Sequence, residues 1–185
     1  AGDLAAPSGL LTVGASVTLG RRVVAPVAAE FLRAHPKVSV SLLFVDRPVN
    51  LVEEGIDVDV RIGELPDSSL VARRVGGVRR MLVASPDYLA RRGAPREATE
   101  LRSHDVIAFT GLMPNREWRY VQDGHGEQLR LAPRLETNDL TAAIAAAEAG
   151  DGITLAPCYM VAEAINQGRL VPVLARLAGP PLPVQ

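Results

Sequence analysis

The sequence contains few cysteine and aromatic residues and no long hydrophobic run. Cys158 is the only cysteine among the 185 residues, which excludes an intrachain disulfide and favours a reducing compartment. Aromatic residues make up 4% of the chain and hydrophobic residues 48%, so we expect a largely aliphatic core. No stretch approaches the roughly 20 apolar residues of a membrane span, and the first residues lack the segments of a secretion signal. These absences favour a cytoplasmic protein with no membrane partner.

Charge of one sign is also lacking, as are the common catalytic and metal-binding motifs. The 20 basic and 21 acidic residues nearly cancel, which argues against a general basic field that grips nucleic acid. No Gly-rich phosphate loop, G-x-S-x-G elbow or HExxH motif is present. His104 and His125 have no metal-ligand spacing between them or to Cys158. We therefore expect no catalytic residue, no metal and no cofactor, and we interpret Cys158 as structural.

The most informative stretch runs from Leu10 to Pro36. An apolar run at 10–15 is typical of a buried strand, and the hydroxyl residues of 16–18 follow it where a helix N-cap belongs. Apolar residues then recur at helical spacing up to Leu32. A strand that leads directly into a helix leaves free N–H groups and the positive end of the helix dipole at the carboxyl edge of the sheet. The sequence therefore predicts a small-anion cradle at Ser16, Val17 and Thr18, although Ser16 as a plain helix cap is an open alternative.

Further strands and helices follow in an alternating order. Residues 38–45 and 57–62 are typical of strands, and Asp46 can cap a short helix from Pro48 to Glu54. The order strand, helix, strand, helix, strand predicts a parallel sheet with right-handed crossovers. Arg61 is a candidate countercharge for an anion, or it lies on the outer face of its strand.

A second α/β set follows two extended runs at 70–75 and 79–84. It begins with a helix near Pro86 and includes a hairpin around Asp123-Gly124. Thr137, Asn138 and Asp139 form a second corner between a strand and a helix, and an Ala-rich helix runs from 140 to 149. Two small lobes would place these two corners opposite each other across one ligand. Asn138-Asp139 as a plain cap is equally open.

Several segments of the chain resemble the effector-binding, or substrate-binding, domain of LysR-type transcriptional regulators. The resemblance rests on residues 11–36, 46–57 and 61–70, on Ala84-Ser85-Pro86-Asp87-Tyr88-Leu89, and on Asn138-Asp139 with the Ala-rich helix and Gly150-Asp151-Gly152-Ile153. It covers nearly the whole chain in the right order. It implies an α/β fold like that of the type 2 periplasmic binding proteins, with two Rossmann-like lobes around a cleft that holds a small effector.

The resemblance also implies domain limits and partners. Residues 1–9 would be a linker stub, 10–84 lobe I without its usual C-terminal return segment, 85–180 lobe II, and 181–185 the start of the return linker. DNA would be bound by an N-terminal domain that precedes Ala1 in the full-length protein. Homodimers would assemble into tetramers.

The site residues implied by matching positions lie where strands end. The effector, expected to be a small carboxylate, would contact Ser16, Val17, Thr18, Gly63, Glu64, Phe109, Thr110, Gly111, Thr137, Asn138, Asp139 and Pro157. The apolar residues of the first helix and the strand after it exceed what one small lobe needs, which predicts a dimer interface. That interface would include Val24, Val27, Phe31, Val40 and Leu42.

Two other functions fit the same fold. A solute-binding protein of a transport system would carry a signal peptide in the complete gene. An enzyme would need a reactive cysteine or lysine in the cleft, and the only lysine, Lys37, lies beyond the end of a helix.

Overall fold

A computed structural model describes residues 6–65 and 70–185, which form two compact units. The first unit comprises the described residues up to Gly76 together with Pro183–Gln185, and the second unit comprises Gly77–Leu182. The division therefore lies at Gly76, and not at residue 84 as predicted. The reason is that strand β5 (Arg80–Ala84) is hydrogen-bonded within the sheet of the second unit.

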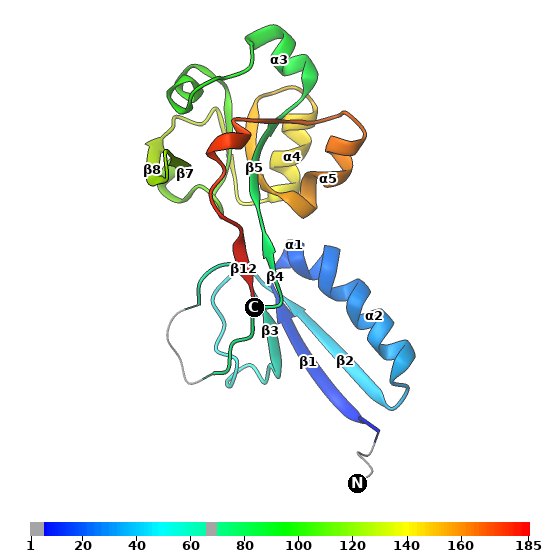
Figure 1. Ribbon diagram of the computed structural model, residues 1–185. Coiled ribbons are helices and arrows are strands. Elements are labelled where there is room, and N and C mark those ends of the chain that lie inside the picture. Colours follow the sequence, from blue (N-terminus) through cyan, green and yellow to red (C-terminus); the bar gives the residue numbers. More distant parts are fainter. Residues whose placement is uncertain (1–5, 66–69) are drawn as a thin grey trace. The chain divides into compact units, whose positions relative to one another are not determined.

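The first unit is built on a parallel sheet with strand order β2-β1-β3 (Figure 1). The strands are β1 (Gly9–Ala15), β2 (Val38–Phe44) and β3 (Val58–Val60), and β1 pairs in parallel with both neighbours. A continuous helical segment follows β1 as α1 (Val17–Leu19), a π-helical turn (Gly20–Val24) and α2 (Ala25–Ala34). The predicted strands at 10–15 and 38–45 and the helix between them are confirmed.

The helix predicted from Pro48 to Glu54 is wrong, because this segment forms turns. The side-chain oxygen of Asn50 accepts hydrogen bonds from the backbone N–H groups of Val52 (3.2 Å) and Glu53 (3.4 Å). Such local bonds offer the backbone an alternative to the helix. Arg47 forms an ion pair with Glu54 (2.7 Å) across the loop. The connection between β2 and β3 is therefore a loop closed by its own polar side chains.

The second unit is built on a sheet with strand order β11-β5-β10-β6-β9. Strand β10 (Ile153–Pro157) lies between β5, which is antiparallel to it, and β6 (Val106–Phe109), which is parallel. The outer strands are β9 (Leu135–Thr137) and β11 (Val171–Val173). The other elements are α3 (Pro86–Arg92), α4 (Leu140–Glu148), α5 (Cys158–Asn166), the hairpin β7–β8 (Glu117–Gln122, His125–Arg130), and 3-10 turns at Ala98–Ser103, Pro114–Arg116 and Ala175–Leu177.

The core of the second unit consists of two hydrophobic clusters. Successive residues of β5 alternate between them, with Leu82 in one cluster and Val83 in the other. The first cluster includes Trp118 of the hairpin, and the second includes buried alanines of α4 and α5. Figure 1 shows the hairpin and these two helices on different sides of β5. The Ala-rich helix packs closely, as predicted, because Ala143 and Ala147 are fully buried.

The last residues of the chain form a strand where the sequence indicated only a turn or linker. Strand β12 (Leu182–Val184) pairs with β4 (Gly76–Val78). Pro183–Gln185 also bond to the segment after β3, since Arg61 and Gln185 exchange two backbone hydrogen bonds of 2.8 and 3.0 Å. The chain therefore returns to the first unit with its last three residues. Within the described ranges, no helix is long and apolar enough to span a bilayer.

Candidate functional site

At the corner between β1 and α1, a carboxylate of the chain itself accepts a hydrogen bond from the backbone at the start of the helix. Ser16 has the extended conformation of an N-cap residue, but its side chain accepts no capping hydrogen bond from the described residues. The backbone N–H of Val17 instead donates to Asp46 Oδ1 at 2.9 Å. Asp46 follows β2, which runs parallel to β1 and pairs Ala15 with Phe44. The residue predicted to cap a helix at 48–54 therefore caps the first helix of the chain.

This arrangement bears on the predicted anion cradle. The Val17 amide can bind a carboxylate, as the Asp46 contact demonstrates, but that amide is already occupied. A ligand at this corner would meet the exposed Asp46 carboxylate beside the half-buried Ser16 and Thr18. Asp46 is a member of the corner that sequence reasoning missed, although its position after the neighbouring parallel strand was a usable signal.

Arg61 is engaged in the sheet rather than free at its edge. Its Nε atom lies 2.7 Å from Asp59 Oδ2, and its Nη1 atom donates to the carbonyl of Val45 at 2.9 Å. The side chains of Arg61 and Asp59 are only 19% and 9% exposed. A Cβ atom at Gly14 would lie 2.5 Å from Asp59 Oδ1, so the glycine makes room for this ion pair. Asp59 balances the Arg61 charge. Arg61 is therefore neither a free countercharge for an anion nor an exposed residue on the outer face of its strand.

The Arg61–Asp59 pair retains some unused hydrogen-bonding capacity. Asp59 Oδ1 and Arg61 Nη2 are buried without a hydrogen-bond partner in the described part of the chain. Buried polar atoms in this state are rare and cost stability. Arg61 thus joins the ends of β2 and β3 through the Val45 carbonyl, and the two unpartnered atoms lower the stability of the folded chain. The sequence pattern did not indicate this arrangement.

Gly63 and Glu64 lie just beyond the end of β3. Gly63 has a φ of +114°, a conformation that side chains rarely adopt. Its N–H donates to the carbonyl of Pro183 (2.9 Å), and its carbonyl accepts from Gln185 Nε2 (2.9 Å). The backbone of Gly63 is therefore occupied by the end of the chain, whereas Glu64 is exposed.

The second predicted corner is also capped by an aspartate, in this case the N-cap residue of the helix itself. Asp139 is the N-cap of α4, and its Oδ1 atom accepts from the N–H groups of Thr141 (2.7 Å) and Ala142 (3.1 Å). The capping interpretation of Asp139 is confirmed. Thr137 accepts a bond from the Asp139 N–H through its hydroxyl (3.0 Å), and Asn138 is exposed. Both corners thus use an aspartate of the chain at a helix N-terminus, where the dipole favours negative charge.

The remaining predicted residues of the second unit lie at the ends of β6 and β10. The Thr110 N–H donates to the carbonyl of Thr137 at 2.9 Å, which joins the β6 end to the β9 end. A Cβ atom at Gly111 would collide with the Phe109 ring at 2.6 Å, so this glycine lets the ring fold back over the chain. Pro157 is buried at the start of α5, and it therefore lies inside the unit rather than on its surface.

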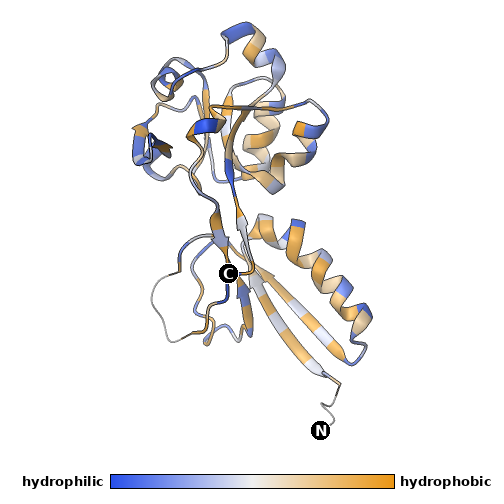
Figure 2. Cartoon of the chain, viewed as in Figure 1, coloured by the Kyte–Doolittle hydropathy of each residue, from blue (hydrophilic) through white to orange (hydrophobic). Residues whose placement is uncertain are grey.

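The predicted dimer interface divides into exposed and buried residues. Val27 is 60% exposed and Leu42 is 37% exposed, and Phe31 and Val40 are half-buried. Every residue of α2 keeps part of its side chain exposed, and Figure 2 shows apolar stretches along β1, β2 and α2. Val24, in contrast, is buried in the core of the first unit, which removes it from such an interface.

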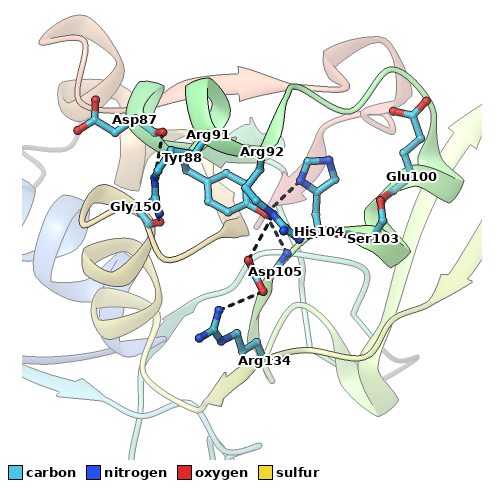
Figure 3. Close-up of polar contacts among 10 residues, drawn as sticks. All are labelled: Asp87, Tyr88, Arg91, Arg92, Glu100, Ser103, His104, Asp105, Arg134 and Gly150. Atoms are coloured by element: carbon cyan, nitrogen blue, oxygen red, sulfur yellow. Dashed lines mark hydrogen bonds and ion pairs between the residues drawn. The ribbon is translucent and has the colours of Figure 1, made fainter.

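A polar cluster in the second unit was missed by the sequence analysis (Figure 3). The Tyr88 hydroxyl accepts a hydrogen bond from the Asp105 N–H (2.8 Å) and lies 3.0 Å from His104 Nδ1. Burial, together with the charge of Arg92, lowers the pKa of His104. The Asp105 carboxylate lies between Arg92 (3.8 Å) and Arg134 (3.3 Å). These contacts connect segments distant in the sequence, and they serve to hold the unit together.

The described residues offer little for metal or nucleophilic chemistry. Among them, no group of three His, Cys, Asp or Glu side chains is arranged to hold a metal ion. Cys158 is half-buried, and its N–H donates to the carbonyl of Arg79 at 2.8 Å.

Comparison with known proteins identifies the family. Residues 5–185 match the LysR substrate binding domain. The chain is 32% identical over 169 residues to the HTH-type transcriptional regulator CrgA of Neisseria meningitidis serogroup B, covering 91% of this chain and 56% of CrgA. It is 34% identical over 180 residues to the HTH-type transcriptional activator AaeR of Escherichia coli K12, covering 96% of this chain and 58% of AaeR. The chain thus spans little more than half the length of these relatives.

Solved structures agree with this assignment. The regulatory domain of CrgA, a LysR-type transcriptional regulator from Neisseria meningitidis, has a TM-score of 0.83 at 30% identity, covering 96% of this chain and 87% of that one. Full-length AphB, a virulence activator of Vibrio cholerae, has a TM-score of 0.84 at 30% identity, covering 96% of this chain and 60% of that one. The α/β fold of two periplasmic-binding-protein-like lobes is confirmed. The chain belongs to the substrate-binding, or effector-binding, domains of LysR-type transcriptional regulators.

Proposed function

We propose that this chain is the sensing domain of a transcriptional regulator, that it binds a small carboxylate effector, and that it has no enzymatic activity. The observation that carries the proposal is the family match over residues 5–185, together with relatives that are named transcriptional regulators. DNA would be bound by a segment outside this chain. A regulator that acts on DNA works where the DNA is, so we place it in the cytoplasm.

The effector would be bound at the strand ends of the two lobes. Ser16 supports this proposal, because its hydroxyl is not used to cap the helix and is half-exposed beside the Val17 amide. Gly63 and Glu64, the segment Phe109–Gly111, and the corner Thr137–Asp139 complete the proposed set. Helix N-termini favour negative groups by about 0.3–1 kcal/mol each at exposed sites, and Asp46 and Asp139 already occupy part of the donors at these two corners. The ligand would shift the equilibrium between two lobe arrangements only by its difference in affinity for them.

Oligomerisation would use the exposed apolar face of α2 and β2. Val27 and Leu42 supply exposed apolar area on this face, and apolar area of this kind marks interaction surfaces. We propose that this face forms a homodimer, and that dimers pair into tetramers in the full-length protein.

The effector proposal is tested by a thermal-shift screen of the 185-residue chain with aromatic and aliphatic organic acids. Each acid is matched with its neutral amide, so that a response to charge is separated from a response to shape. A ligand at a hundred times its dissociation constant should add about 2.7 kcal/mol of stability. Ser16→Ala should weaken the response, whereas Ser39→Ala, an exposed serine on β2, should not. A complete screen in which no acid raises the melting temperature contradicts the carboxylate assignment.

The dimer proposal is tested by sedimentation of a charged variant. Val27→Asp should shift the chain towards the monomer, because a carboxylate would be buried in an apolar contact. Val52→Asp places the same charge on an exposed valine in the 51–55 turn and should leave the distribution unchanged. Equal behaviour of the two variants refutes the α2–β2 face.

A further inference from the structure

A pocket in the second unit is lined by two arginines that form no ion pair with any described residue. It lies between the β7–β8 hairpin, Arg80 at the start of β5, and the segment Gly179-Pro180, and its volume is about 500 Å³. Sites for small molecules usually measure about 300–1,000 Å³. The pocket is therefore large enough for a small organic ligand. Its residues all belong to the second unit, and none of them is in the effector-site set described above.

Arg80 and Arg119 differ from the six arginines that carry ion pairs in the described part of the chain. Within the described ranges, neither forms an ion pair or a side-chain hydrogen bond. Arg80 is half-buried, and Arg119 is exposed on β7. Burial lowers the pKa of Arg80, and the nearby charge of Arg119 lowers it further. The arginines with acidic partners are Arg47, Arg61, Arg92, Arg116, Arg134 and Arg169.

Two like charges that share a pocket repel each other, and Glu127 is the one acidic residue of the lining that offsets them. Arginine does not relieve this cost by losing its proton, because the guanidinium group stays protonated in proteins. An anion between the two guanidinium groups would remove the repulsion and satisfy donors that are otherwise exposed only to water. A carboxylate suits this position because it matches the fork of guanidinium donors.

The other lining side chains narrow the class of ligand. Tyr120 and Gln128 supply a hydroxyl and an amide, which can donate further hydrogen bonds. Glu127 lies opposite Tyr120 in the hairpin and places one negative charge at the rim, so the lining residues carry a net charge of +1. That modest charge favours a small carboxylate over a polyanion such as nucleic acid.

We propose that this pocket is a second ligand site, which binds a small organic carboxylate between Arg80 and Arg119. The site is independent of the proposed effector site at Ser16, because it lies in a different part of the chain and uses none of its residues. A regulator with two such sites would respond to two metabolites, or to two concentrations of one.

The test measures binding of succinate to the 185-residue chain by calorimetry at constant ionic strength. Arg119→Gln should raise the dissociation constant at least tenfold, and so should Arg80→Gln. Arg130→Gln is the matched control, because it removes one exposed positive charge from the same hairpin outside the pocket. If Arg80→Gln does not fold, the exposed Arg119→Gln still tests the site.

Three outcomes overturn the proposal. In the first, succinate at millimolar concentration produces no binding heat with the unmodified chain. In the second, succinate binds the Arg119→Gln variant as tightly as it binds the Arg130→Gln variant. Binding that Ser16→Ala abolishes and Arg119→Gln leaves intact assigns succinate to the corner at Ser16 instead. A second readout is the melting temperature without ligand, which Arg119→Gln should raise relative to Arg130→Gln because the repulsion of Arg80 is removed. Inorganic phosphate at the same concentration distinguishes a carboxylate site from a general anion site.

Discussion

Asp46 would compete with an anionic effector bound at the corner of the first unit, and its replacement by asparagine tests this competition directly. The carboxylate accepts a hydrogen bond from the Val17 N–H at 2.9 Å, at the N-terminal end of the first helix. Asp46→Asn keeps an oxygen acceptor at this position and removes the charge. The folded chain should lose about 0.3–1 kcal/mol, the usual contribution of an exposed acid at a helix N-terminus.

The effect on the ligand has the opposite sign. Two carboxylates about 4 Å apart repel each other by about 1 kcal/mol in water-like surroundings, and by about 4 kcal/mol at an effective dielectric constant of 20. Asp46 is exposed, so the smaller value applies. Asp46→Asn should therefore tighten the binding of an anionic effector about fivefold while lowering the stability of the ligand-free chain.

The assay is isothermal calorimetry with an acid identified in the thermal screen, repeated with its amide. Asp57→Asn serves as the control, because Asp57 also accepts a backbone hydrogen bond in the first unit, from Thr12 at 2.8 Å, and lies away from the corner. The amide should bind both variants alike. The reasoning is refuted if Asp46→Asn binds the acid with unchanged or weaker affinity, since the acid then does not approach the Val17 amide.

The remaining predictions concern the second unit. Tyr88→Phe should destabilise the chain by about 1–3 kcal/mol in urea unfolding, because the Asp105 N–H loses its acceptor at a site where Tyr88 is 1% exposed. Tyr120→Phe is the control and should cost less, because the Tyr120 hydroxyl has no hydrogen bond within the described residues. Equal losses of stability in the two variants would contradict the role of the Tyr88 hydroxyl. The folded chain lowers the pKa of His104 below the ordinary value of about 6.5, so below that pH the unfolded chain binds more protons and stability should fall as the pH drops. His104→Gln should flatten this part of the stability profile, and a slope that survives the substitution assigns it to other groups. Gly152→Ala should cost about 1–3 kcal/mol, because its Cβ would collide with the backbone carbonyl of Asp105, to which the Ile153 N–H donates at 2.9 Å. Gly126→Ala, with no neighbour within 4 Å, is its control, and similar melting temperatures for the two variants would contradict the close approach.

Features whose cause lies within a few residues could be predicted from the sequence. The strand at 10–15 and the helix after it follow from apolar spacing, and the hairpin of β7 and β8 follows from the turn residues Asp123-Gly124. Asp139 was identifiable as a cap because the N–H groups that donate to its side chain lie two and three residues further along. The family resemblance belongs to the same class, since it rests on short runs of residues in order.

The way in which distant segments share their polar groups depends on the fold and could not be predicted from local patterns. Asp46 caps a helix 29 residues before it, and it can do so because β2 returns beside β1. The division at Gly76 follows from the insertion of β5 between strands of the second unit, and Arg61 is neutralised through its packing against Asp59. The physical reason is that a helix N-terminus or a buried charge accepts whichever partner the fold brings near. The local sequence shows that such a group requires a partner, and the fold determines which residue that partner is.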